Sequence, residues 1–109
     1  MVEERLMDAV GCVSGSSPAF VYMFIEALAD SGVKYGLPRK TAYAMAAQTV
    51  LGSAKMILET GKHPGQLKDE VCSPGGTTIA GVSALEEHGL RNAVIKAADA
   101  CYEKTQSMK

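Results

Sequence analysis

Apolar residues recur at helical spacing along the chain, and glycine and proline divide this pattern into six segments. We find no stretch with the strict alternation of apolar and polar residues that predicts a half-buried strand. Apolar positions three and four residues apart indicate helices instead. The chain is therefore predicted to be all-α. The expected helices cover residues 3–13, 18–35, 38–59, a short segment from 63, a segment after 78 that ends near 87, and 91–106.

The ends of these segments follow from backbone chemistry. Gly36, Gly61 and Gly89 each stand directly after an apolar segment, where glycine readily adopts the left-handed conformation that ends a helix. Pro18 can occupy the first turn of its helix, where no backbone donor is needed. We find no internal repeat, and we expect one helical domain over residues 1–109.

Two of the predicted helices are apolar on nearly every face, over residues 20–28 and 41–58. A helix that is apolar all round must be buried all round. A domain of about 110 residues hides only about two-thirds of the surface of its unfolded chain. We therefore predict that a partner chain covers these helices, most simply in a symmetric homodimer. The alternative is a compact bundle with both helices at its centre.

Composition excludes several classes of function. The net charge is −1, and the lysines are interleaved with acids, so we expect no nucleic-acid surface. No run reaches the roughly 20 apolar residues of a membrane span. Three widely spaced cysteines and two histidines have no metal-ligand spacing, so no metal site is expected. The cysteines are read as reduced thiols of an intracellular protein.

The usual nucleotide-binding motifs are absent. The sequence has no G-x-G-x-x-G and no strand to precede one, so we expect no Rossmann domain in this chain. The dipeptide Gly61-Lys62 has Met56 at the position where a phosphate-binding loop needs a glycine.

One hexapeptide stands out, with three hydroxyl residues, a proline and two adjacent glycines at positions 73–78. Hydroxyl residues are preferred helix caps, so the segment can simply start a helix. The amides of a helix N-terminus, approached closely over glycine, also suit a carboxylate or phosphate. By itself the hexapeptide does not decide between these interpretations.

Several motifs in order resemble the C-terminal domain of pyrroline-5-carboxylate reductases. They are DAV at 8–10, SGS at 14–16, PAF at 18–20, EALADSGVKYGLPR at 26–39, AAQTVLGSAKM at 46–56, HPGQLKD at 63–69 and CSPGGTTIAG at 72–81. The resemblance implies a fold like the interlocked C-terminal domain of 6-phosphogluconate dehydrogenase. It also implies homodimers that often assemble into rings, and a separate N-terminal Rossmann domain that holds NADPH or NADH.

The resemblance further implies reduction of Δ1-pyrroline-5-carboxylate to L-proline. The substrate is expected to bind beside residues 73–78. Its carboxylate is expected to meet the backbone amides near Gly76 and Thr77 and the hydroxyl of Thr78. Ser73 belongs to the same loop, and Val71 is expected to line the substrate ring.

Three further positions are assigned by the resemblance. Glu70 stands where relatives often carry an amide near the cofactor. Glu4 matches an acidic position near the substrate, expected to act across the dimer interface, although it can equally be a solvated glutamate in a first helical turn. Gly11 replaces a threonine of the family pattern, whose hydroxyl is expected near the substrate's ring nitrogen.

Two other functions are left open. Gly11 and the missing nucleotide motif favour a catalytically inactive oligomerisation module with the same fold. A helical domain of another β-hydroxyacid-dehydrogenase-like enzyme is a third reading, against which the proline-family motifs argue. The compartment is expected to be cytoplasmic or mitochondrial.

Overall fold

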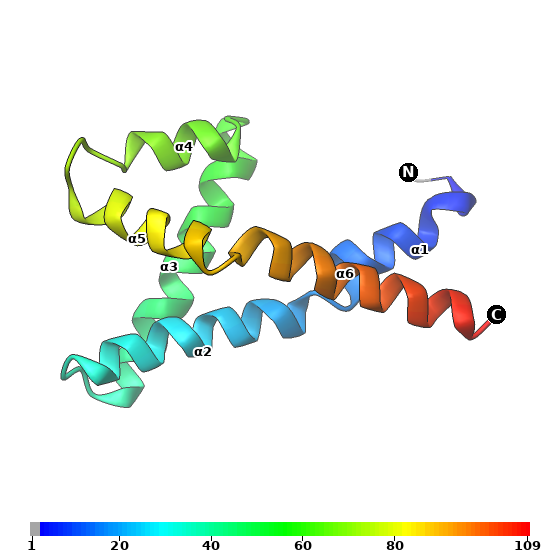
Figure 1. The fold of residues 1–109 in the computed structure, drawn as a ribbon, viewed down its shortest axis with the longest axis horizontal. Helices are drawn as coiled ribbons and strands as arrows, with labels where there is room; N and C mark the ends of the chain where they lie inside the picture. The colour runs from blue at the N-terminus through cyan, green and yellow to red at the C-terminus, as the bar shows by residue number, and fades with distance from the viewer. Residues whose placement is uncertain (1–2) are drawn as a thin grey trace. The chain divides into compact units, whose positions relative to one another are not determined.

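The computed structural model of the protein describes residues 3–109, and all of the regular structure in this range is helical (Figure 1). The all-α prediction is therefore confirmed. Five helices have seven or more residues, and a short N-terminal series of turns precedes them. The elements are η1 (Glu4–Leu6), α1 (Met7–Val10), η2 (Gly11–Gly15), α2 (Pro18–Lys34), α3 (Arg39–Thr60), α4 (Pro64–Glu70), α5 (Thr77–Glu87) and α6 (Leu90–Ser107).

The first segment differs from its prediction as one regular helix. It begins as the 3₁₀ turn η1, continues as α1, and widens into the π-helical turn η2. In that turn the Ser16 amide donates to the Gly11 carbonyl at 2.9 Å, one residue further along than in an α-helix. Glycine has a low helix propensity, so Gly11 and Gly15 do not enforce regular α-geometry here.

The described chain forms two compact units, residues 3–23 with 88–109 and residues 24–87. In the first unit α1 and η2 lie against α6, and Cys12 is buried. In the second unit α2 and α3 form a hairpin around three buried residues, Ala29, Ala42 and Ala46. The shared feature of this hairpin core is small side chains, which let two helices approach closely.

Gly32 shows how close this approach is. A Cβ atom at this position would lie 3.0 Å from Leu37 Cδ1 and 3.4 Å from Ala42 Cβ. The turn between the helices ends at Gly36, whose φ of 106° is accessible to glycine and strained for other residues. Across the turn, Arg39 Nη1 donates to Asp30 Oδ1 at 2.9 Å, and this hydrogen bond raises the pKa of the Arg39 guanidinium.

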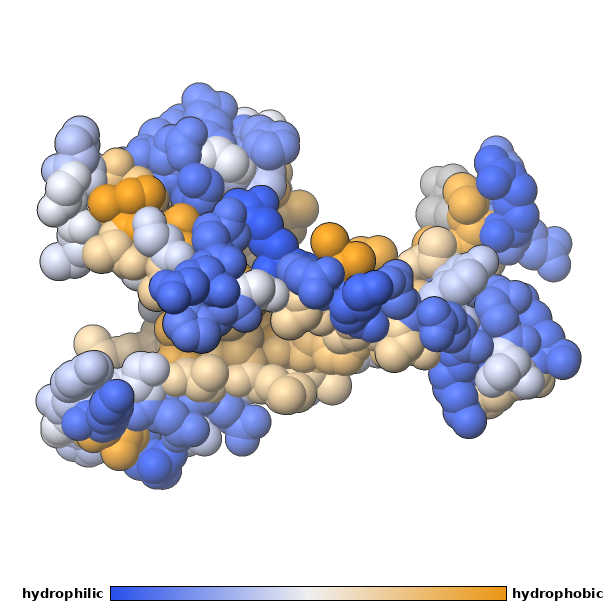
Figure 2. All heavy atoms as spheres, viewed as in Figure 1, coloured by the Kyte–Doolittle hydropathy of each residue, from blue (hydrophilic) through white to orange (hydrophobic). Residues whose placement is uncertain are grey.

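The second unit does not bury either apolar helix on all sides. On α3 the residues at 47, 51, 54 and 58 recur at four- and three-residue spacing, on the side away from Ala42 and Ala46. Leu51 is 61% exposed and Leu58 is 84% exposed. Figure 2 shows hydrophobic side chains at the molecular surface. The unit by itself is therefore not the compact bundle with two central helices that was the alternative to dimerisation.

By length and composition alone, the described helical run Glu4–Lys34 is apolar enough to cross a membrane. The sequence analysis predicted no membrane-spanning segment. The structure differs because η1, α1, η2 and α2 follow one another as a single helical run, which is longer than any helix predicted there. A helix that another protein chain covers passes the same test, so its apolar character does not identify what lies against it.

Candidate functional site

The hexapeptide at 73–78 forms a tight turn followed by the start of α5. The Gly76 amide donates to the Ser73 carbonyl at 3.0 Å and closes the turn. Pro74 and Gly75 occupy its two central positions, and Gly75 has a φ of 70°. Proline followed by a glycine with positive φ is the combination that a type II turn requires. The turn reverses the chain directly after α4 and directs it into α5.

Gly76 is the point of closest approach in this turn. A Cβ atom there would lie 2.5 Å from Ser73 Oγ and 3.2 Å from the Ser73 carbonyl oxygen. The Ser73 side chain therefore lies over the Gly76 backbone, in space that any larger residue would occupy. Glycine is favoured at this position by contact rather than by backbone conformation, because a larger residue would displace the Ser73 side chain.

The start of α5 offers backbone donors beside the turn. Amides in the first turn of a helix have no acceptor within the helix, and they carry partial positive charge. In α5 these are the amides of Thr77, Thr78 and Ile79. Thr77 and Thr78 are exposed, whereas Gly76 is half-buried. The segment is thus a helix start, as one interpretation predicted, and its geometry also suits a small carboxylate.

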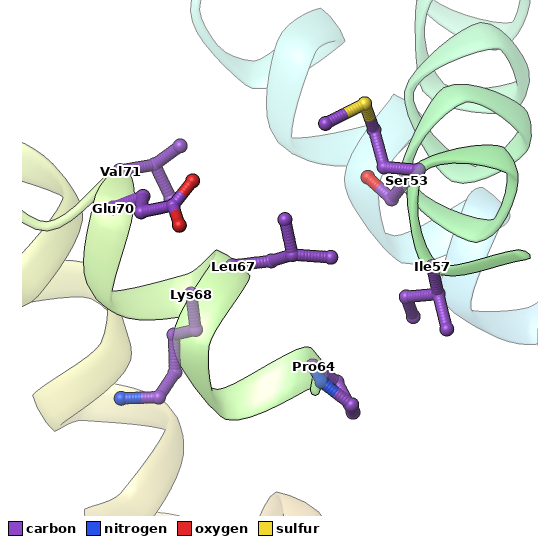
Figure 3. Close-up of a pocket in the computed structure, with 8 residues that line it drawn as sticks. Ser53, Ile57, Pro64, Leu67, Lys68, Glu70 and Val71 are labelled. Atoms are coloured by element: carbon purple, nitrogen blue, oxygen red, sulfur yellow. The ribbon is translucent and has the colours of Figure 1, made fainter. Parts of the chain in front are cut away.

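A hollow of about 380 Å³ lies between α3 and α4 (Figure 3). Its lining is mostly apolar, and in the close-up Leu67 extends from α4 toward Ile57 and Ser53 of α3. The lining residues are Ser53, Met56, Ile57, Pro64, Leu67, Lys68, Glu70 and Val71. Val71, which is 64% exposed, belongs to both this hollow and the chain segment that enters the turn.

Glu70 is engaged within the chain. Its carboxylate pairs with Lys62 Nζ at 3.2 Å, and both side chains are partly exposed. The pair joins the segment before α4 to the last residue of α4. A contact from Glu70 to a cofactor would have to share the carboxylate with Lys62, and this predicted role stays a prediction.

The predicted site residues fall into two groups. Val71 and the hexapeptide with Glu70 lie in the second unit, whereas Glu4 and Gly11 lie in the first. Glu4 is exposed in η1, and Gly11 is the first residue of η2. A Cβ atom at Gly11 would meet no atom within 4 Å, so a Cβ substituent there meets no neighbouring side chain.

Sequence reasoning missed Lys62 and the α3 side of the hollow. Lys62 precedes α4, so its pairing with Glu70 does not follow the three- or four-residue spacing of helical ion pairs. The spacing of Leu67 and Val71 did indicate a common apolar face of α4. Which helix this face would meet depends on the turn at Gly61, whose φ is 69°.

His63 caps α4 through its side chain. Its Nδ1 accepts a hydrogen bond from the Gly65 amide at 2.9 Å, which leaves the other ring nitrogen to carry the proton. We expect His63→Ala to destabilise the protein by about 1 kcal/mol, and His63→Asn to restore most of this loss because asparagine is a good cap. Chemical denaturation measures both values. Equal destabilisation by the two variants would contradict the capping role.

Neither a metal site nor a reactive thiol is indicated within residues 3–109. No group of three histidine, cysteine or acidic side chains in this range is placed to hold a metal ion. The three cysteines are free. Burial raises the pKa of the Cys12 thiol, and nearby Cys101 and Asp8 act in the same direction. A thiol of this kind stays protonated at neutral pH, and the thiolate is the nucleophilic form.

Comparison with known proteins identifies the family. The family model described as pyrroline-5-carboxylate reductase dimerisation matches residues 4–108, which is nearly the whole chain. The chain belongs to this family. The match covers both compact units and includes the turn at 73–78, so the family resemblance inferred from the motifs is confirmed.

Curated relatives carry the same family name. The chain is 59% identical over 108 residues to the pyrroline-5-carboxylate reductase of Escherichia coli K12, which covers 99% of this chain and 40% of the relative. It is 60% identical over 102 residues to that of Methanosarcina acetivorans, with 90% of this chain and 38% of the relative covered. The chain thus spans about two-fifths of the length of the relatives that it matches.

Solved structures of the family have the same fold. The 1-pyrroline-5-carboxylate reductase of Streptococcus pyogenes has a TM-score of 0.95 and 44% identity, and the match covers 98% of this chain and 41% of that one. The pyrroline carboxylate reductase of Plasmodium falciparum, solved with NADP bound, has a TM-score of 0.93 and 40% identity. That match covers 98% of this chain and 43% of that one.

Proposed function

We propose that this chain is the dimerisation and substrate-binding part of a pyrroline-5-carboxylate reductase, which reduces Δ1-pyrroline-5-carboxylate to L-proline. The observation that carries this proposal is the turn at 73–78, which leads into the exposed amides and hydroxyls at the start of α5. Family membership indicates the class of reaction, and the segment 73–78 offers hydrogen-bond donors for the carboxylate of the substrate.

In this proposal the chain binds the substrate mainly through its carboxylate, and this contact positions the ring. Of the two amides expected to meet it, that of Gly76 already donates to the Ser73 carbonyl, whereas that of Thr77 is free to donate to the carboxylate. The amide and hydroxyl of Thr78 add two donors, and the partial positive charge of α5 favours the anion. Gly76 has no side chain and so leaves room for the Ser73 side chain, which lies over it. Val71 lies just before the turn and supplies an apolar contact for the ring.

A nicotinamide cofactor supplies the hydride when it is bound. The described residues of this chain offer it no glycine-rich phosphate loop, and Glu70 shares its carboxylate with Lys62. We therefore assign most of the binding of NADPH or NADH to a separate nucleotide domain. The contribution of this chain is orientation, which places the C=N carbon at reacting distance from the hydride donor.

The same proposal assigns the exposed apolar face of α3 to a second copy of the chain. Leu51 and Leu58 each stabilise an association by about 1.5–3 kcal/mol when fully buried. Glu4, exposed in η1, would then reach the substrate bound to the partner, and the dimers would assemble further into rings.

Gly11 favours a second candidate function. If the family threonine is needed to hold the ring nitrogen, a chain with glycine there keeps the fold and the dimer but not catalysis. The open space around the Cβ position of Gly11 makes the difference between the two functions testable, because the family threonine can be introduced there.

Calorimetric titration with L-proline tests whether residues 76–78 bind the carboxylate. We expect Thr78→Ala to weaken binding roughly 10- to 100-fold, because a hydrogen bond to a charged group contributes about 1.5–3 kcal/mol. Thr105→Ala is the matched control, since its hydroxyl donates to the Cys101 carbonyl at 3.0 Å, within α6. If the unchanged chain and the variant with Gly11→Thr both fail to bind L-proline, the substrate site is refuted and the inactive module is favoured.

A further inference from the structure

The carboxylate of Asp8 joins the two ends of the first unit. Its Oδ2 accepts a hydrogen bond from Gln106 Nε2 at 2.7 Å, and Lys109 Nζ is in contact with the same oxygen. The Asp8 side chain is only 23% exposed, whereas that of Lys109 is 60% exposed. Figure 1 shows the described start of the chain and its C-terminal end on the same side of this unit.

The elements that Asp8 holds form the outer end of the helical run Glu4–Lys34. η1 has three residues and α1 has four, and the end of a helix frays unless other contacts hold it. η1 and α1 contain no buried residue. α1 does contact α6, and the side-chain hydrogen bond from Gln106 to Asp8 joins these two helices.

The two partners of Asp8 contribute differently. An exposed ammonium such as that of Lys109 is screened by water and salt, so its pairing contributes little. The Gln106 amide donates to the same charged oxygen from within α6, and hydrogen bonds to a charged acceptor are stronger than those between neutral groups. Gln106 is therefore the main partner of Asp8.

We propose that Asp8 is a positioning residue, which holds η1 and α1 against the end of α6 and thereby sets the place of Glu4. This inference rests on the proposed function, because it takes Glu4 to approach the substrate. Glu4 lies one helical turn before Asp8, and Gly11 lies three residues after it. A loosened α1 therefore moves both positions without changing the turn at 73–78.

Steady-state kinetics of the full protein, in which this chain is joined to its nucleotide domain, test the role. We expect Asp8→Ala to raise KM for pyrroline-5-carboxylate about tenfold, with kcat and KM for the nicotinamide cofactor changed by less than about twofold. Asp8→Asn should stay near the unchanged protein, since its amide oxygen still accepts from Gln106. Asp99→Ala, on exposed α6 surface in the same unit, is the matched control.

A purely structural loss would give a different result, because a smaller folded fraction lowers kcat and leaves KM unchanged. Gln106→Ala is the second variant, which removes the same hydrogen bond and keeps the charge of Asp8. If both variants leave KM for pyrroline-5-carboxylate unchanged in an active enzyme, the positioning role is overturned.

Hydrogen exchange separates this inference from the proposed function. In Asp8→Ala we expect amides of residues 4–8 and 106–109 to exchange about tenfold faster, with α3, α4 and α5 unaffected. Unchanged exchange at residues 4–8 and 106–109 overturns the proposal that Asp8 holds these two segments together. If exchange is faster in Asp8→Ala but the protein without substitutions has no reductase activity, Asp8 still holds η1 and α1 against α6. Its proposed effect on the substrate is then overturned, and the proposed function is contradicted.

Discussion

Replacing Leu51 with glutamate is expected to convert the protein from a dimer to a monomer. Leu51 lies on the face of α3 away from Ala42 and Ala46 and is 61% exposed within one chain. A buried leucine contributes about 1.5–3 kcal/mol, and a symmetric interface contains it twice. Because Leu51 is already partly buried within one chain, the loss is about 2–4 kcal/mol, which corresponds to a dissociation constant roughly 30- to 700-fold higher, before the cost of burying a charge is added.

Lys96→Glu is the control for this variant. It makes the same change to a glutamate at an exposed position of α6, outside the apolar face of α3, so it should leave the dimer unchanged. Analytical ultracentrifugation at micromolar concentration measures the result. An unchanged dimer in Leu51→Glu, or a well-folded monomer of the unchanged chain, would contradict the proposed interface. Partition of an unchanged monomer into lipid vesicles would assign the apolar face to a membrane instead.

Gly76→Ala is expected to weaken the binding of L-proline about 100-fold. The new Cβ atom would lie 2.5 Å from Ser73 Oγ and 3.2 Å from the Ser73 carbonyl, so the serine side chain must rotate away and the carbonyl must shift slightly. We expect these movements to displace the first amides of α5. Two or three displaced donors to a charged carboxylate account for an effect of this size.

Gly81→Ala is the matched change within α5. A Cβ atom at Gly81 would meet no atom within 4 Å, and alanine in a helix interior is about 1 kcal/mol more favourable than glycine. This variant should keep its affinity for L-proline and unfold at a slightly higher temperature. Calorimetric titration measures the affinity of both variants for L-proline, and thermal denaturation measures their stability. Equal affinities would show that the turn does not form the binding seat.

The helices were predictable because local chemistry defines them. The predicted segment 18–35 is found as Pro18–Lys34, and 91–106 is found as Leu90–Ser107. Proline at a first turn and glycine after a last turn act within a few residues, so no distant contact is needed to place the ends. The π-turn η2 was not predicted, since the difference between α- and π-helical bonding is small and leaves no clear pattern in five residues.

The candidate site was predictable in part. The residue types of the hexapeptide predicted a helix start, which the structure has at Thr77, whereas the tight turn closed by Ser73 and Gly76 was not predicted. The roles of its residues toward a substrate came from family resemblance, and they stay predictions. The pairing of Lys62 with Glu70 and the hollow between α3 and α4 join residues whose separation matches no helical period, so sequence patterns could not indicate them.

The sequence by itself determined the helical class, most of the helix boundaries, the family resemblance and the helix start near residue 78, because these depend on local residue chemistry and on matching motifs. Only the tertiary structure decided that Ser73 lies over Gly76, that Asp8 accepts from Gln106, and that the far face of α3 is open. These features depend on where the chain returns in space. Residues 98 positions apart meet through packing, and no local propensity encodes that meeting.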